Sequence, residues 1–230
     1  MRNLILLLFF TFTLSLHAQR TDFVEIDFKK ADAIAMRYQG EELKSLPVLA
    51  LRLTAQLHTD VERFRAIYYW ITHNVRGDYH MTSQNEYKRK KFKDHPKKLQ
   101  QWNHEFTKEV FTKLREEKTT LCTGYAYLVK ELANLVGLEC EIVHGYGTMN
   151  VMKLNNLDIP NHSWNVVKLN GTWYLCDATW SSGTIDMSNY RFTFSFDDTF
   201  FLTEPSEFAK NHKPLDEKWS LLIPSVVTNK

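Results

Sequence analysis

The 230-residue chain lacks a strong charge bias, internal repeats and low-complexity segments. Its 29 basic and 27 acidic residues leave a formal net charge of only +2, so nothing suggests general attraction to nucleic acid. Hydrophobic residues make up 43% of the chain and charged residues 24%, which is the ordinary balance of a globular protein. The length suits one domain, or a small domain with extensions.

Cysteine is scarce, with only Cys122, Cys140 and Cys176 present. In an exported protein an odd count leaves at least one thiol free or paired between chains. The chain also lacks the tight pairs of ligands that usually mark a zinc site in sequence. The leftover thiol therefore needs an explanation other than a disulfide framework.

An apolar run without charge, LILLLFFTFTLSL, occupies residues 4–16 behind the positive charge of Arg2. Ala18 is a small residue at which a signal peptidase could cut, and the run is too short for a comfortable membrane span. We expect residues 1–18 to be a signal peptide and the mature protein to be secreted or periplasmic, without stable membrane insertion. An uncleaved anchor is the alternative. No cysteine follows the run, which argues against lipid attachment there.

Helical patterns dominate the first half of the chain. Residues 27–56 look like a helix broken by glycine and proline. Thr59 followed three residues later by Glu62 fits a capping box. Apolar residues then recur at steps of three and four through residues 61–75, which predicts one buried helix face.

A strongly basic segment at residues 86–99 reads as a solvated face or as a docking patch for an acidic partner. A polar helix is expected from about residue 103 to residue 118. The next helix begins near Thr120 and ends before Gly137, a residue typical of a C-terminal cap. Cys122 therefore lies in the first turn of a largely buried helix.

Three strands are expected next, at residues 138–147, 162–169 and 172–180. Asn170-Gly171 between the second and third strands is a strong signal for a two-residue hairpin. Helices followed by an antiparallel sheet that packs on the Cys122 helix make an α+β arrangement.

Alternation along the strands predicts where the polar groups meet. His162 shares a strand face with Trp164, and Asp177 shares one with Trp173; both largely apolar faces should pack on the Cys122 helix. Positions near His162 lie opposite positions near Asp177 across the hairpin. A buried carboxylate needs a partner, and the neighbouring imidazole supplies it.

Cys122, His162 and Asp177 then have the roles of a catalytic triad. A helix N-terminus favours the thiolate of Cys122, which would attack a carbonyl. His162 would take and return the proton, and Asp177 would fix its tautomer. The backbone N–H of Cys122 would help hold the oxyanion, with Trp102 and Asn74 as guesses for a second donor.

The segments LCTGYAYLVKEL and NHSWNVVKLNGTWYLCDATWSSG resemble the transglutaminase-like superfamily in its Cys–His–Asp order. AIYYWITHNVRGDY upstream and FFLTEPSEFAKNHKPLDEKWSLL downstream are similar to its bacterial, kyphoscoliosis-peptidase-like branch. The resemblance covers roughly residues 45–225 and implies one domain over residues 19–230, with a papain- or transglutaminase-like core. The chain departs from the family at Thr120, where glycine is common, and at Gly77, where an aromatic residue is common.

The resemblance implies a cysteine-dependent enzyme that forms a thioester with a protein or peptide substrate, without cofactor or metal. Water as the second nucleophile would make it a protease or amidase, and an amine would make it a transglutaminase. One alternative is a non-catalytic protein-binding module with this fold. Another is a zinc protein that uses Cys122, His144, His162 and Asp177. His144 should point inward, as a rival base or, preferably, as a packed histidine. Oligomeric state is not predicted.

Cys140 and Cys176 are not expected to form a disulfide. Alternation should place them on opposite faces of the sheet, and they should lie at opposite ends of the middle strand. Bridged cysteines need Cα atoms within about 7 Å, whereas two strand spacings already separate them by roughly 10 Å.

Overall fold

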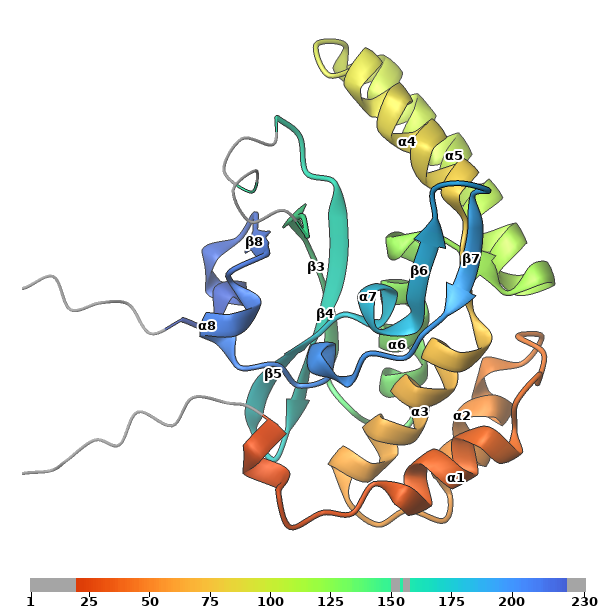
Figure 1. Ribbon diagram of the computed structural model, residues 1–230, viewed down its shortest axis with the longest axis vertical. Coiled ribbons are helices and arrows are strands. Elements are labelled where there is room, and N and C mark those ends of the chain that lie inside the picture. The colour runs from red at the N-terminus through yellow and green to blue at the C-terminus, as the bar shows by residue number, and fades with distance from the viewer. Residues whose placement is uncertain (1–19, 150–153, 155–157, 223–230) are drawn as a thin grey trace, which may run out of the picture.

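The computed structural model describes residues 20–149, 154 and 158–222. The expected signal peptide at residues 1–18 lies outside these described residues. No helix in the described part of the chain is long and apolar enough to cross a membrane. The chain forms helical and β layers around a four-stranded sheet (Figure 1), which confirms the expected α+β class.

The first helices pack together at the lower right of Figure 1, beside the sheet: α1 (Lys29–Arg37), α2 (Leu46–Thr54) and α3 (Asp60–Asn74). The predicted capping box opens α3, because the Thr59 hydroxyl accepts from the Glu62 N–H and the Glu62 carboxylate accepts from the Thr59 N–H. Arg65, inside α3, is buried and ion-pairs with Asp32 of α1 and with Asp198. These pairs tie the helical layer to the C-terminal half of the chain.

Helices α4 (Tyr79–Lys91) and α5 (Pro96–Glu117) form a hairpin that projects from the body of the molecule (Figure 1). The polar helix expected from residue 103 thus begins earlier, since proline is tolerated in a first helical turn. The basic segment at 86–99 covers the tip of this hairpin.

Helix α6 (Cys122–Leu135) follows a short parallel pair formed by β1 (Arg76–Gly77) and β2 (Thr119–Thr120). Gly137, with φ of +80°, follows the helix end as predicted. Cys122 is the first residue of α6, so its predicted place in the first helical turn is confirmed.

The antiparallel sheet has the order β5-β4-β3-β8. Its strands are β3 (Cys140–Gly147), β4 (His162–Leu169), β5 (Thr172–Cys176) and β8 (His212–Pro214). The β4–β5 hairpin turns at Asn170 and Gly171, whose φ values of 50° and 84° fit the predicted two-residue turn. Strand β8 was not predicted from the sequence.

The third predicted strand, 172–180, is too long. It ends at Cys176, and Asp177 caps the short helix α7 (Ala178–Ser182) by accepting from the N–H groups of Thr179 and Trp180. A carboxylate that accepts helix N–H groups favours this strand-to-helix change over further extension.

The sheet is covered on both faces, and the predicted assignment of the faces was wrong. The strand residues that pack with α6 and α3 are Cys140, Val167, Leu169, Tyr174 and Cys176. The opposite face packs on Phe200 and Phe208 and contains Val143, Trp164, Val166 and Leu175. Alternation correctly grouped the residues of one strand, but an apolar face does not reveal which layer covers it when both faces are buried.

The C-terminal region wraps around the sheet and α3. Its elements are β6 (Gly183–Asp186), β7 (Arg191–Phe194), α8 (Pro205–Phe208) and single 3-10 turns at Asp198–Phe200 and Glu217–Ser220, with another turn at Arg20–Phe23 near the start of the described chain. Strand β8 follows α8 and pairs with the end of β3.

All three cysteines are free thiols. Two of the reasons against a Cys140–Cys176 bridge were wrong. Both residues lie on the α6 face, and their partners on β4, Val167 and Asn165, are only two residues apart rather than at opposite ends of that strand. The remaining reason is that β4 runs between them, so two strand spacings of about 10 Å in total exceed the reach of a disulfide.

Candidate active site

Cys122 is partly exposed at the N-terminus of α6, where Leu121 is the N-cap residue. The start of this helix is tightly packed. A Cβ atom on Gly124 would lie 1.9 Å from the hydroxyl oxygen of Thr120, which is itself completely buried. Thr120, one of the departures from the family pattern, therefore makes glycine necessary at position 124.

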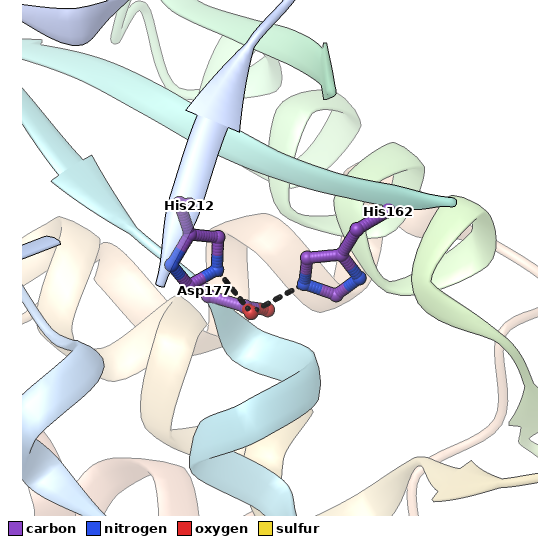
Figure 2. A group of neighbouring side chains, drawn as sticks. All are labelled: His162, Asp177 and His212. Carbon is purple, nitrogen blue, oxygen red and sulfur yellow. Dashed lines mark hydrogen bonds and ion pairs between the residues drawn. The ribbon is translucent and has the colours of Figure 1, made fainter. Parts of the chain in front are cut away.

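His162 begins β4 and is 8% exposed. Its Nε2 donates to Oδ2 of Asp177 over 2.7 Å, and its other ring nitrogen lies on the far side of the ring (Figure 2). The Trp180 ring stacks on the imidazole with a centroid distance of 4.9 Å. Gly147 leaves room for the ring, because a Cβ atom there would lie 2.7 Å from His162 Cδ2. The imidazole is held between strand, indole and carboxylate.

Asp177 is completely buried, and hydrogen bonds reach both carboxylate oxygens. Oδ1 accepts from the backbone N–H groups of Thr179, at 2.8 Å, and Trp180, at 3.4 Å. Oδ2 accepts from His162 and also from Nε2 of His212, at 3.2 Å (Figure 2). The strand-to-helix turn thus presents one oxygen to its own helix and the other to two imidazoles.

His212 is a site residue that the sequence reasoning missed. It lies on β8, is 2% exposed, and stacks on Phe208 with a centroid distance of 3.9 Å. The one signal for His212 in the sequence was that it lies inside the downstream segment that is similar to the kyphoscoliosis-peptidase-like branch. A strand of three residues at the edge of a sheet is too short to have a recognisable periodicity. The sequence therefore did not show that β8 brings His212 next to Asp177.

The charges of the site favour a thiolate and an imidazolium. Burial raises the pKa of Asp177, but the charge and hydrogen bond of His162 lower it by more than burial raises it. The net pKa of Asp177 is therefore well below the usual range. Burial lowers the pKa of His162, but Asp177, helped by Cys122, raises it to about 10. For Cys122, burial raises the thiol pKa, while hydrogen bonds from His162 and from the Ser163 N–H, together with the charge of His162, give a net lowering.

The other two thiols are in the opposite situation. Burial raises the pKa of both Cys140 and Cys176; the charge of Lys130 acts in the opposite direction on Cys140 but does not offset the effect of burial. Only Cys122 combines partial exposure with a lowered pKa, which are the conditions for a reactive thiol.

His144 is exposed, so the expectation of a packed, inward histidine was wrong. Its Nδ1 lies 2.9 Å from the hydroxyl of Ser163, and the partial burial of the ring together with the charge of Arg89 lowers its pKa. The ligand set of the alternative zinc protein is not brought together either. Within the described residues, the group whose potential ligand atoms lie within 4.8 Å of one another is His162, Asp177 and His212, without Cys122 or His144.

Both guesses for a second oxyanion donor already donate a hydrogen bond elsewhere. The amide nitrogen of Asn74 donates to the Trp70 carbonyl at the end of α3. The indole N–H of Trp102 donates to Asn85 over 3.2 Å, although Trp102 packs on the same apolar cluster as Cys122. The N–H groups at the start of α6 remain the donors closest to the thiol in sequence.

Comparison with known proteins now identifies the family. The sequence profile of the transglutaminase-like superfamily matches residues 47–178. The chain is 34% identical to human kyphoscoliosis peptidase over 201 residues. This alignment covers 86% of this chain and 27% of the human protein. This chain belongs to the transglutaminase-like superfamily.

The chain is also similar to other known proteins. Hillarin from Drosophila melanogaster is 28% identical over 211 residues, which cover 86% of this chain and 23% of hillarin. The chain therefore spans about a quarter of the length of these curated relatives. A solved structure titled "Crystal structure of a TGase" aligns over 82% of this chain and 40% of its own, with 13% identity and a TM-score of 0.41.

Alkylation tests the difference between the three thiols. With iodoacetamide near pH 6, where an ordinary thiol is almost fully protonated, we expect Cys122 to be labelled before Cys140 and Cys176. Peptide mapping by mass spectrometry locates the label. His162→Ala should slow the labelling of Cys122, because the lowered thiol pKa depends on that histidine. Preferential labelling of Cys140 or Cys176 in the folded protein would count against the site.

A second prediction concerns His212. His212→Phe keeps an aromatic ring against Phe208 but removes the N–H that Asp177 accepts, so we expect a loss of about 1–3 kcal/mol in the free energy of unfolding. Denaturant titration measures this loss. His144→Phe is the control, since substitution of an exposed histidine should stay within about 0.5 kcal/mol. Equal stability of His212→Phe and the unmodified protein would mean that the His212–Asp177 hydrogen bond contributes nothing.

Proposed function

We propose that this chain is an exported cysteine-dependent acyl-transfer enzyme of the protease, amidase or transglutaminase type. The observation that carries the proposal is the connected series Cys122–His162–Asp177, in which a partly exposed thiol of lowered pKa contacts an imidazole bound to a buried carboxylate. Membership of the transglutaminase-like superfamily supports the same chemistry.

The proposed reaction proceeds through a thioester. The Cys122 thiolate attacks the carbonyl carbon of an amide and forms a C–S bond. The tetrahedral oxyanion is held by the backbone N–H of Cys122 at the positive end of α6. As the C–N bond breaks, the imidazolium of His162 gives its proton to the leaving amine. Asp177 keeps the ring oriented and stabilises its positive charge.

The second half of the reaction decides the product. Water that attacks the thioester yields a carboxylic acid, whereas a primary amine yields a new amide. In either case His162 takes a proton from the attacking group and the thiolate leaves. The proposed substrate is a protein or peptide, and all of the steps use side chains of this chain, without a cofactor.

The catalytic proposal is tested by mixing the pure protein with candidate peptides and an amine probe, then following conjugates and hydrolysis products by mass spectrometry. His162→Ala should lose roughly two to four orders of magnitude in rate, the usual scale for acid–base catalysis. His144→Ala is the matched control and should have a mild effect, because His144 has no aspartate to orient it. If His144→Ala lost most of the reaction rate while His162→Ala stayed active, the choice of His162 as the base would be overturned.

Failure of every peptide together with an unreactive Cys122 would instead favour the non-catalytic binding module. Fold and activity separate readily, so this outcome would leave the family assignment untouched.

Export is a separate part of the proposal and rests on the apolar run at residues 4–16. Cleavage after Ala18 would make Gln19 the first residue of the mature protein. Expression of the full chain in a host with a signal peptidase, followed by N-terminal peptide mapping of the exported fraction, should yield a peptide that begins at Gln19. A protein that retains Met1 and stays bound to the membrane would indicate an uncleaved anchor.

A further inference from the structure

A cleft of about 320 Å³ opens beside the candidate site. The helical hairpin α4–α5 forms one wall of the cleft, and β3, β4 and the start of α6 form the others. His162 and Ser163 lie in its lining, next to Leu121 and Thr123, the neighbours of Cys122 in the chain. A group bound in this cleft would therefore lie beside the thiol and imidazole.

The described side chains that line the cleft include a positive charge and no negative charge. Arg89 of α4 lines it, is half-buried, and has no carboxylate partner among the described residues. The next residue, Lys90, pairs with Glu86 on the same helix instead. No aspartate or glutamate is among the described residues that line the cleft. A partly buried guanidinium without a counter-charge favours an anionic group in the same space.

The surroundings of Arg89 also suit an anion. Partial burial and the charge of Arg89 lower the pKa of His144, another lining residue, and so favour its neutral form, which can still hydrogen bond. The carbonyl oxygen of the Asn85 side chain accepts from Trp102, so its NH₂ group remains to donate. Phe106 and Val110 provide an apolar surface on the same side. The cleft thus combines hydrogen-bond donors, one cation and a hydrophobic wall.

We propose that this cleft binds peptide segments that carry an aspartate or glutamate side chain near the reacting carbonyl, with Arg89 as the residue that pairs with the carboxylate. The inference rests on the proposed function for one point, that the bound segment is the acyl donor. Bidentate pairing with a carboxylate is the geometry that a guanidinium favours, and an aliphatic neighbour of the acidic residue would pack on the apolar wall.

Binding to the Cys122→Ala protein tests the proposal without any reaction. The probes are fluorescent peptides, acetylated and amidated at their ends, in which one Glu is moved through an otherwise neutral sequence of Ala, Leu and Gln. Matched peptides have Gln or Lys in place of that Glu. A hydrogen bond to a charged group is worth about 1.5–3 kcal/mol, so we expect at least one Glu position to bind about tenfold more tightly than its Gln counterpart.

Substitutions in α4 assign the preference to a residue. Arg89→Gln should abolish the preference for Glu, and Arg89→Glu should invert it in favour of Lys. Lys90→Gln is the control, because it removes a cation from the same helix outside the cleft lining and should leave the preference unchanged. A preference that survives Arg89→Gln, or that Lys90→Gln reduces equally, would overturn the proposal. So would the absence of any preference for Glu.

A last probe has a free C-terminus and no acidic side chain. If this peptide alone binds in an Arg89-dependent way, the recognised carboxylate is a chain terminus and the proposal of an acidic side chain is wrong. Alkylation of Cys122 in the unmodified protein is measured separately. If the thiol is inert but the preference for Glu depends on Arg89, the catalytic proposal is refuted and the proposal of an acidic peptide in the cleft stands. If the thiol is reactive but no such preference is found, the catalytic proposal stands and the cleft proposal is refuted.

Discussion

The buried carboxylate of Asp177 is the group on which the rest of the site depends. A buried charge without partners is strongly unfavourable, and this one accepts from backbone N–H groups on one oxygen and from His162 and His212 on the other. These donors come from α7, β4 and β8, which are far apart in the sequence. The fold brings them together around one side chain, so loss of a donor affects both stability and the orientation of His162.

Asp177 also determines the character of the thiol, although it acts through His162. The carboxylate raises the pKa of His162, and the resulting imidazolium lowers that of Cys122. Trp180, which lies in the same short helix that Asp177 caps, stacks on the imidazole and shields the pair from water. For the two core cysteines the effect of burial prevails, and they are the less acidic thiols. The lowered thiol pKa is thus a property of the position at the start of α6 rather than of cysteine itself.

The sequence was informative wherever a local pattern corresponds to one local structure. The capping box at Thr59, the place of Cys122 in the first turn of α6 and the hairpin at Asn170-Gly171 were all predicted correctly. The proximity of His162 and Asp177 followed from the hairpin register, although Asp177 caps a helix rather than continuing a strand. These features involve neighbours in the chain, or residues that one tight turn connects.

The errors arose where distant segments decide the outcome. Which face of β4 meets α6 depends on the C-terminal segment around Phe208, which makes the other face equally apolar. His212 reaches Asp177 only because β8 pairs with the end of β3. His144 was expected to be packed, but the α4–α5 hairpin leaves an open cleft beside it. None of these arrangements has a signature in the spacing of residues along one segment.

The central claim is that His162, held by Asp177, keeps Cys122 as a thiolate. The ultraviolet absorbance of the thiolate, followed against pH in the unmodified protein, with Cys122→Ala as the blank, measures this directly. The midpoint should lie clearly below the value of about 8.5 for an ordinary thiol, and His162→Ala should move it upward. A midpoint at or above the ordinary value, unchanged by His162→Ala, would contradict the account.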